Sequence, residues 1–204
     1  MTRNTRPPKS LLITGFEPFP GMPINPTSLL IKRLPMRLPD LFQNTLVQFA
    51  LLPTTWSGRK SAASVLRAKL QPDAILHFGV AGKRRNISIE TRAVNCATRI
   101  IPDAAGVHFP HVVLEKDAPA ARYSTLPVKA LQQASLRAGV PTSLSRDAGT
   151  YLCNATLWDS LRDGYKAAFV HVPPLPHPND RTRPGYLQVE QACINIILET
   201  ARRI

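Results

Sequence analysis

The sequence predicts an α/β protein, a three-layer α/β/α sandwich built on an open, mostly parallel twisted sheet. Short apolar runs of strand length alternate with longer segments of helical periodicity, which is typical of a parallel sheet covered by helices on both faces. The 20 prolines lie between these segments and therefore mark loops. A length of 204 residues suits one domain. We expect residues 1–204 to form a single domain, with residues 1–9 flexible.

The first half of the chain is predicted to run strand, helix, strand, helix, strand. Residues 10–16 are an apolar run that predicts a buried strand. Asn25 and Pro26 open a helix, because Asn caps helices well and Pro suits the first helical position. This helix is expected to end at about Leu34, before Pro35. Strands at residues 46–52 and 74–80 flank a helix at residues 57–70, whose apolar face carries Ala62, Val65, Leu66 and Leu70.

The second half resumes the alternation after a less regular stretch. Residues 87–101 alternate in polarity enough to predict extended or hairpin structure. Helices are expected at residues 127–138, 153–162 and 186–203, and strands at residues 142–145 and 167–172. The last helix has a long apolar stripe formed by Val189, Ala192, Cys193, Ile196, Ile197 and Ala201. In sheets of this kind, ligands bind beyond the carboxyl ends of the strands.

Composition and charge exclude several classes of protein. No apolar run approaches the ~18 residues of a membrane span, so we expect no membrane contact. Three cysteines are an odd number and too few for a disulfide framework, which indicates free thiols and a reducing, cytoplasmic compartment. The 26 Lys and Arg against 13 Asp and Glu give a formal charge of +13, yet no nucleic-acid-binding motif accompanies them. An arginine-rich soluble surface is therefore favoured over a nucleic-acid-binding surface.

Three polar residues could carry chemistry. Cys153 lies where a glycine-containing turn runs into a predicted helix, His171 lies inside an apolar strand, and Glu90 follows a basic loop. A cysteine attacks carbonyl carbon as its thiolate, a histidine can carry the proton, and a carboxylate can orient the imidazole. Buried cysteines and histidines are also ordinary core residues, so spacing alone leaves both interpretations open. Cys193 and Cys96 are interpreted as structural.

Other candidate motifs are rejected. The segment GVAGKR at residues 79–84 lacks the glycine spacing of a phosphate loop, and Arg84 stands where a hydroxyl would be needed. No dinucleotide-binding fingerprint follows Gly15. His77 lies in an apolar run typical of the core, and the remaining histidines show no metal-ligand spacing: His108, His111 and His177. We therefore predict no metal site.

Four sequence blocks carry a family resemblance. They are LLITGFEPFPGMPINPT at residues 11–27, GVAGKRRNISIETRAVN at residues 79–95, AGTYLCN at residues 148–154 and FVHVPPLP at residues 169–176. In this order they resemble the segments of pyroglutamyl peptidase type I, the pyrrolidone-carboxylate peptidase family of cysteine peptidases. The third and fourth blocks match the family patterns AGT-[FY]-[VL]-CN and F-[IV]-H-[IV]-P-x-[IL]-P. Together the blocks span almost the whole chain.

The resemblance implies a thiol protease that removes an N-terminal pyroglutamyl residue from peptides. The family's triad carries over as Cys153, the nucleophile, His171, the general base and acid, and Glu90, the orienting carboxylate. The residues that match the family's apolar ring pocket are Phe16, Phe19, Tyr151 and Leu152. The resemblance also implies a single cysteine-peptidase-like α/β domain, assembly as a homotetramer, and no metal or organic cofactor.

Two departures from the family pattern fall near the implied site. Val80 stands where the family usually has Gln, and Ile100 where it usually has Arg, with Arg99 one residue earlier. Because a one-residue shift in a strand turns a side chain to the opposite face, we expect Arg99 to miss the site and the enzyme to be slow. Two alternatives stay open. One is a related cysteine amidohydrolase of other acyl preference or weak activity, and the other, ranked last, is a basic α/β protein that binds nucleic acid.

Overall fold

A six-stranded sheet forms the middle of the molecule in the computed structural model, which describes residues 8–38, 45–177, 180 and 182–204. The strand order is β2-β1-β3-β8-β4-β7. These strands are β1 (Lys9–Phe16), β2 (Thr45–Leu52), β3 (Ala74–Val80), β4 (Ile87–Glu90), β7 (Thr142–Ser145) and β8 (Ala167–Val172). All neighbouring pairs are parallel except β4 and β8, which are antiparallel. The prediction of an open, mostly parallel sheet is confirmed.

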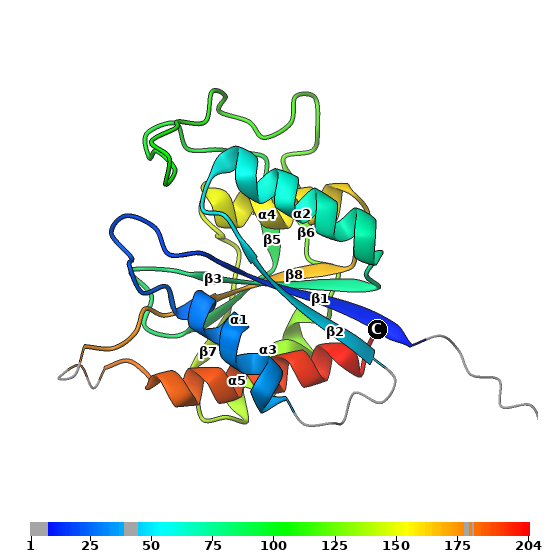
Figure 1. Cartoon of the computed structure of the whole chain (residues 1–204), viewed down its shortest axis with the longest axis vertical. Coiled ribbons are helices and arrows are strands. Elements are labelled where there is room, and N and C mark those ends of the chain that lie inside the picture. Colours follow the sequence, from blue (N-terminus) through cyan, green and yellow to red (C-terminus); the bar gives the residue numbers. More distant parts are fainter. Residues whose placement is uncertain (1–7, 39–44, 178–179, 181) are drawn as a thin grey trace, which may run out of the picture.

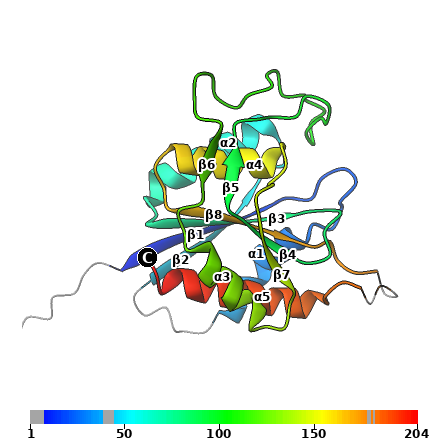
Figure 2. The ribbon, with the colours of Figure 1, turned by 180° about the vertical axis from the view of Figure 1, so that it is seen from behind.

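Helices cover both faces of the sheet (Figures 1 and 2). On one side lie α1 (Pro26–Arg37), α3 (Val128–Leu136) and α5 (Tyr186–Ala201), and on the other lie α2 (Trp56–Leu70) and α4 (Leu152–Arg162). Successive side chains along each strand point to opposite faces of the sheet, so each strand contributes residues to two separate cores. In β1, Leu11 and Ile13 join the core beneath α1 and α5, whereas Leu12 joins the core beneath α2 and α4. This arrangement gives the three layers that the sequence predicts.

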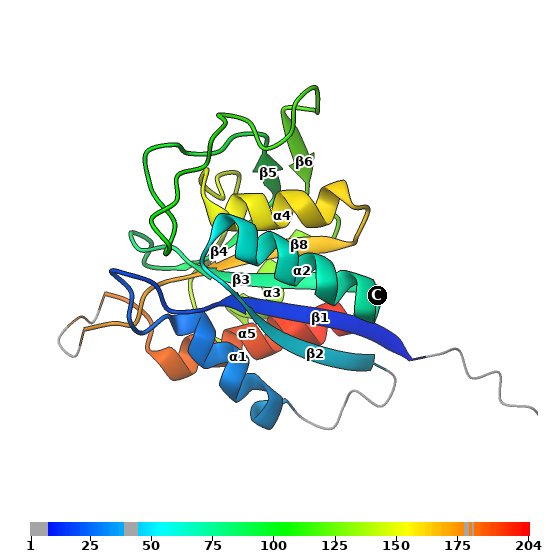
Figure 3. The same cartoon turned by 45° about the horizontal axis from the view of Figure 1, so that its top comes forward.

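A small second sheet stands above α4 (Figure 3). It pairs β5 (Arg92–Val94) with β6 (Ala121–Tyr123) in antiparallel fashion. The amide side chain of Asn154 in α4 joins β5 by accepting from the Val94 N–H at 2.8 Å and donating to the Val94 carbonyl at 2.8 Å. The expected extended stretch at residues 87–101 therefore divides into β4, β5 and an irregular segment. The partner of β5 comes from a distant part of the chain, so no local hairpin forms.

The helix α1 runs past the proline that was expected to stop it. It ends at Arg37, and Pro35 lies inside its last turn. A proline there removes one backbone donor, while the N–H of Leu38 still bonds to the Leu34 carbonyl at 3.0 Å. Leu34 is fully buried, so core packing holds the turn that Pro35 weakens.

The inner face of α2 also differs from the expectation. Val65 is 65% exposed, and the buried stripe is instead Trp56, Arg59, Ala63 and Arg67. Hydrophobic periodicity could not find this stripe, because half of it is arginine. Ala62, Leu66 and Leu70 flank it and pack partly against the core.

The other elements lie within two residues of their expected bounds. The expected flexibility of residues 1–9 is wrong at Lys9, which begins β1 and pairs with Asp73 at 3.3 Å. Residues 1–7 lie outside the described part of the chain. None of the helices in the described part of the chain combines the length and the hydropathy that a membrane span requires.

Candidate active site

The thiol of Cys153 lies in the first turn of α4, close to the carboxyl end of β3. Tyr151 caps the helix in an extended conformation, and Gly149 before it turns the chain with a positive φ of 75°. A Cβ atom at Gly79 of β3 would stand only 2.9 Å from Cys153 Sγ. Gly79 is the register partner of His171 in β8. The sheet therefore brings the thiol close to the strand position that carries the histidine.

His171 and Glu90 form a buried pair across the β4–β8 junction. The Nδ1 atom of His171 lies 2.8 Å from Glu90 Oε1, and the two residues are 4% and 0% exposed. With Nδ1 engaged by the carboxylate, Nε2 is the nitrogen free to exchange a proton. No hydrogen bond joins Cys153 to His171 among the described residues, and catalytic hydrogen bonds commonly tighten only when substrate binds.

Burial sets the protonation states of these two groups. The pKa of Cys153 is raised to about 12, first by burial and then by the negative charge of Glu90. The pKa of His171 is lowered, because burial outweighs its hydrogen bond and attraction to Glu90. At neutral pH the free site thus holds a neutral thiol and a neutral imidazole. This pair can react when the imidazole takes the thiol proton during attack.

Arg84 contacts the same carboxylate, a role that was not predicted from the sequence. Its Nη1 donates to Glu90 Oε1 at 2.5 Å, and its Nη2 donates to the Asp147 carbonyl at 2.5 Å and to Ser145 Oγ at 3.3 Å. Arg84 lies six residues before Glu90 in the second of the four sequence blocks. This position was the one sequence feature that could have indicated a role in the site.

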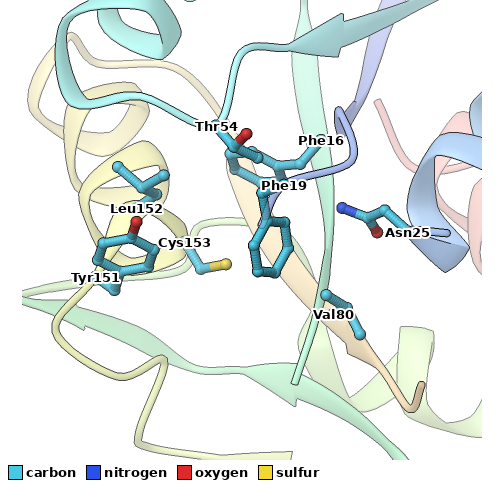
Figure 4. Close-up of a pocket in the computed structure, with 8 residues that line it drawn as sticks. All are labelled: Phe16, Phe19, Asn25, Thr54, Val80, Tyr151, Leu152 and Cys153. Atoms are coloured by element: carbon cyan, nitrogen blue, oxygen red, sulfur yellow. The ribbon is translucent and has the colours of Figure 1, made fainter. Parts of the chain in front are cut away.

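A mostly apolar pocket opens beside Cys153 (Figure 4). All four residues expected to line it do so: Phe16, Phe19, Tyr151 and Leu152. Sequence reasoning did not identify Asn25 or Thr54, which also line it, and Val80 faces it as well. Phe16 and Val80 end β1 and β3, and Thr54 follows β2, so the pocket lies where parallel sheets place their ligands.

The polar atoms of the pocket wall are largely engaged within the protein. The amide of Asn25 accepts from Thr27 and donates to the Glu17 carbonyl. The hydroxyl of Tyr151 donates to the Pro102 carbonyl at 2.9 Å. A ligand in this pocket therefore meets mainly apolar side-chain surface.

The strand argument for Arg99 and Ile100 is wrong, because residues 98–101 form no strand. Both side chains are exposed, Ile100 by 86%, and Arg99 lines a separate surface hollow with Pro110 and His111. Arg99 does lie away from the pocket, as expected, but for a different reason. Its position is set by the course of the loop and not by the alternation of side chains along a strand.

The remaining cysteines and His77 can now be placed. Cys193 is buried in the core, as expected, but Cys96 is exposed and so is not a core residue. His77 is buried and bridges Thr14 Oγ1 at 2.6 Å and Ser160 Oγ at 2.9 Å. Within the described ranges, no three His, Cys, Asp or Glu side chains gather closely enough to hold a metal ion.

Comparison with known proteins finds one family. Residues 9–201 match the family described as pyroglutamyl peptidase. The chain is 38% identical to a pyrrolidone-carboxylate peptidase of Thermococcus kodakarensis over 80% of each chain. It is 34% identical to that of Gloeobacter violaceus over 94% of this chain and 96% of the relative.

Solved structures agree in fold. Pyrrolidone carboxyl peptidase from Thermococcus litoralis superposes with a TM-score of 0.83 at 30% identity, over 94% of this chain and 93% of that one. Pyroglutamyl peptidase I from Bacillus amyloliquefaciens gives a TM-score of 0.85 at 25% identity, over 96% and 98%.

Proposed function

Because this chain belongs to the pyroglutamyl peptidase family, we propose that it removes pyroglutamyl residues from peptide N-termini through a Cys153–His171–Glu90 triad. It is a cysteine peptidase of the pyroglutamyl peptidase I type. The observation that carries the triad is the buried His171–Glu90 pair next to a cysteine that opens onto an apolar pocket.

The reaction follows from the placement of these groups. His171 Nε2 takes the thiol proton as Cys153 Sγ attacks the pyroglutamyl carbonyl carbon, which forms a C–S bond and places negative charge on the carbonyl oxygen. The imidazolium then gives its proton to the peptide nitrogen, the C–N bond breaks, and a thioester remains on Cys153. Water, deprotonated by His171, attacks the thioester, and the thiolate leaves with the proton returned to it. Throughout these steps Glu90 accepts a hydrogen bond from the Nδ1–H of His171, and its charge stabilises the imidazolium.

The pocket explains why a lactam is accepted. The pyroglutamyl ring has two apolar faces, which the aromatic rings of Phe16 and Phe19 can contact. A free N-terminal ammonium would lose its hydration against this wall without gaining a charged partner, so ordinary N-termini are excluded. The carbonyl oxygen needs donors in the transition state, and the backbone N–H of Cys153 at the helix start is the natural one.

Assembly, location and domain structure belong to the same proposal. The exposed apolar side chains of the loop over residues 100–113 support a homo-oligomer, a homotetramer as in the family resemblance; they are Ile100, Ile101, Val107, Val112 and Val113. Three free cysteines favour a reducing, cytoplasmic compartment. The continuous six-stranded sheet supports one catalytic domain.

An amide panel tests the function. Chromophore release is measured from a pyroglutamyl amide and from acetyl, prolyl and glutaminyl amides. We expect release from the pyroglutamyl amide alone, and none by Cys153→Ala. Cys96→Ala is the matched control, because this thiol is free and exposed and its loss should leave activity unchanged. Preference for another acyl group would favour the related amidohydrolase instead.

The triad is tested in the same assay. His171→Ala should lower kcat about 10²–10⁴-fold, the usual contribution of general acid–base help. Glu90→Gln should lower it less, because the side chain keeps its shape but loses the charge that stabilises imidazolium. A folded His171→Ala enzyme with wild-type turnover would contradict this mechanism.

A further inference from the structure

We propose that Arg84 is a positioning residue of the peptidase reaction, whose guanidinium fork ties Glu90 to the loop that carries Cys153 and so holds His171 in line with the thiol. This inference rests on the triad proposed above. Arg84 itself is not placed in contact with substrate.

The first support is the isolation of the Glu90 carboxylate. Glu90 is 0% exposed, and its Oε1 receives both Arg84 Nη1 and His171 Nδ1. Its Oε2 is buried without a hydrogen-bond partner among the described residues. The carboxylate's direction is therefore set by Arg84 and His171 alone. Without Arg84, the orientation of Glu90 would depend on the imidazole that it is meant to orient.

The second support is the other arm of the fork. Nη2 of Arg84 donates to the Asp147 carbonyl and to Ser145 Oγ. Asp147 in turn bonds back to Ser145 Oγ through its N–H and accepts from the Gly149 N–H through its carboxylate at 2.9 Å. This turn leads directly into the first turn of α4, where Cys153 lies. One planar guanidinium thus joins the proposed acid of the triad to the segment that leads into Cys153.

The third support is charge. A buried carboxylate beside a neutral imidazole is costly unless a cation balances it, and Arg84 is 24% exposed while its Nη1 reaches Glu90 directly. The guanidinium places that cation directly against Glu90 Oε1, the same oxygen that lies 2.8 Å from His171 Nδ1. Lysine could supply the charge, but a single ammonium cannot reproduce the planar fork.

The experiment compares Arg84→Met, Arg84→Lys, Glu90→Gln and His171→Ala with wild type. Arg85→Met is the matched control, because the neighbouring arginine is exposed and carries the same charge. For each enzyme, kcat and KM on a pyroglutamyl amide are measured across pH, and thermal unfolding checks the fold. We expect Arg84→Met to lower kcat about 10- to 100-fold, the size seen when outer-shell partners of metal-site histidines are lost, with KM within about twofold. Arg84→Lys should recover part of kcat.

The pH profile separates positioning from a structural role. The charged groups facing His171 are Glu90 from β4, Arg84 from the loop after β3 and Asp147 from the loop after β7. Cys153 faces Glu90 and Arg84 and also Arg59 from α2. Arg84 disfavours the imidazolium, so its removal should raise the pKa of His171 and move the acidic limb of kcat/KM to higher pH.

The outcomes are distinct. An Arg84→Met enzyme with wild-type kcat, or one whose acidic limb stays in place or moves to lower pH, overturns the role of Arg84. If Arg84→Met does not fold, Arg84→Lys decides: kcat and acidic limb equal to wild type would show that the fork is not needed. If Glu90→Gln and His171→Ala keep full kcat, the triad itself is wrong. If these two lose kcat while Arg84→Met keeps it, only this inference fails.

Discussion

The thiol of Cys153 rests against a glycine because any side chain there would displace it. A Cβ at residue 79 would lie 2.6 Å from the Phe169 ring and 2.9 Å from Cys153 Sγ, closer than real Cβ contacts allow. Phe169 is itself fully buried, and its ring centroid lies 4.8 Å from that of His171. A methyl group at residue 79 would therefore have to displace the Phe169 ring, the thiol or both. At the scale of single residues, the absence of a Cβ atom at residue 79 leaves the space that the thiol of Cys153 occupies.

Gly79→Ala should therefore damage both catalysis and stability. We expect kcat to fall about 100-fold, since a misplacement of about 1 Å has that effect, and the free energy of unfolding to fall by about 1–3 kcal/mol. Gly82→Ala is the matched control, because a Cβ there meets nothing within 4 Å. Steady-state kinetics and urea unfolding check both variants. Equal kcat for the two would show that the close approach at Gly79 does not matter.

Arg99 provides a second test at this scale. Its side chain is exposed and lies outside the residues that line the pocket beside Cys153. An exposed charge is screened by solvent, so Arg99→Ala should change kcat on a small pyroglutamyl amide by less than about threefold. A large loss of kcat in this variant alone would show that the loop carries Arg99 into the site when substrate binds.

Two ion pairs join α2 to α4 and its C-terminal cap within one helical layer, and the first of them is buried. Arg59 bonds to Asp159 at 2.7 Å with both side chains almost fully buried, and Arg67 bonds to Asp163 at 2.9 Å. Burial lowers the pKa of Arg59, and the attraction of Asp159 opposes that shift. Because Cys153 lies in the first turn of α4, this contact between elements also helps to hold the candidate active site in place.

Asp159→Asn should be strongly destabilising, because it leaves a buried guanidinium without its counter-charge. The expected loss is about 3–5 kcal/mol in the free energy of unfolding, measured by urea titration. Lys9→Met removes one partner of an exposed pair and should stay within about 1 kcal/mol of wild type. The double replacement Arg59→Met with Asp159→Leu should recover much of the loss, since apolar side chains replace the buried pair. Similar stabilities for Asp159→Asn and Lys9→Met would contradict this account.

The whole molecule buries two histidines in its cores, and this makes its stability depend on pH. His77 bridges β1 and α4 through Thr14 and Ser160, and burial lowers its pKa to about 3. The pKa of His171 is lowered as well. In the unfolded chain both histidines would have a pKa of about 6.5. At pH values between the folded-state and unfolded-state pKa of these histidines, the unfolded chain binds protons that the folded protein does not bind.

The contribution of neutral His77 to the free energy of unfolding should therefore be complete above about pH 6.5. It should be lost as the pH falls toward 3, at up to about 1.4 kcal/mol per pH unit. His77→Asn removes this titration, so its stability should fall less steeply over the same range, although its stability at neutral pH is lower. Urea unfolding from pH 4 to 8 measures both slopes. Parallel slopes for the two proteins would mean that His77 does not carry the effect.

The order and type of the elements other than β6 could be predicted from the sequence, because hydrophobic periodicity and capping residues act over a few positions. The three-residue strand β6 was not predicted, because its pairing with the distant β5 leaves no local pattern. The strands at residues 74–80, 142–145 and 167–172 match their expected bounds, and Asn25 caps α1 as its position before Pro26 indicates. The triad candidates and the four pocket residues came from residue chemistry and family resemblance, and the fold brings all four pocket residues to the wall beside Cys153. Their roles in the reaction stay predictions.

Only the tertiary structure decided which distant groups meet. Arg59 faces inward because Asp159, 100 residues away, receives it, and Arg84 reaches both Glu90 and the loop before Cys153. The raised pKa of Cys153 and the exposure of residues 99 and 100 depend in the same way on what surrounds them. Local sequence carries periodicity, whereas burial and charge pairing are properties of contacts between segments far apart in the chain. These contacts exist only after the sheet and its two helical layers have assembled.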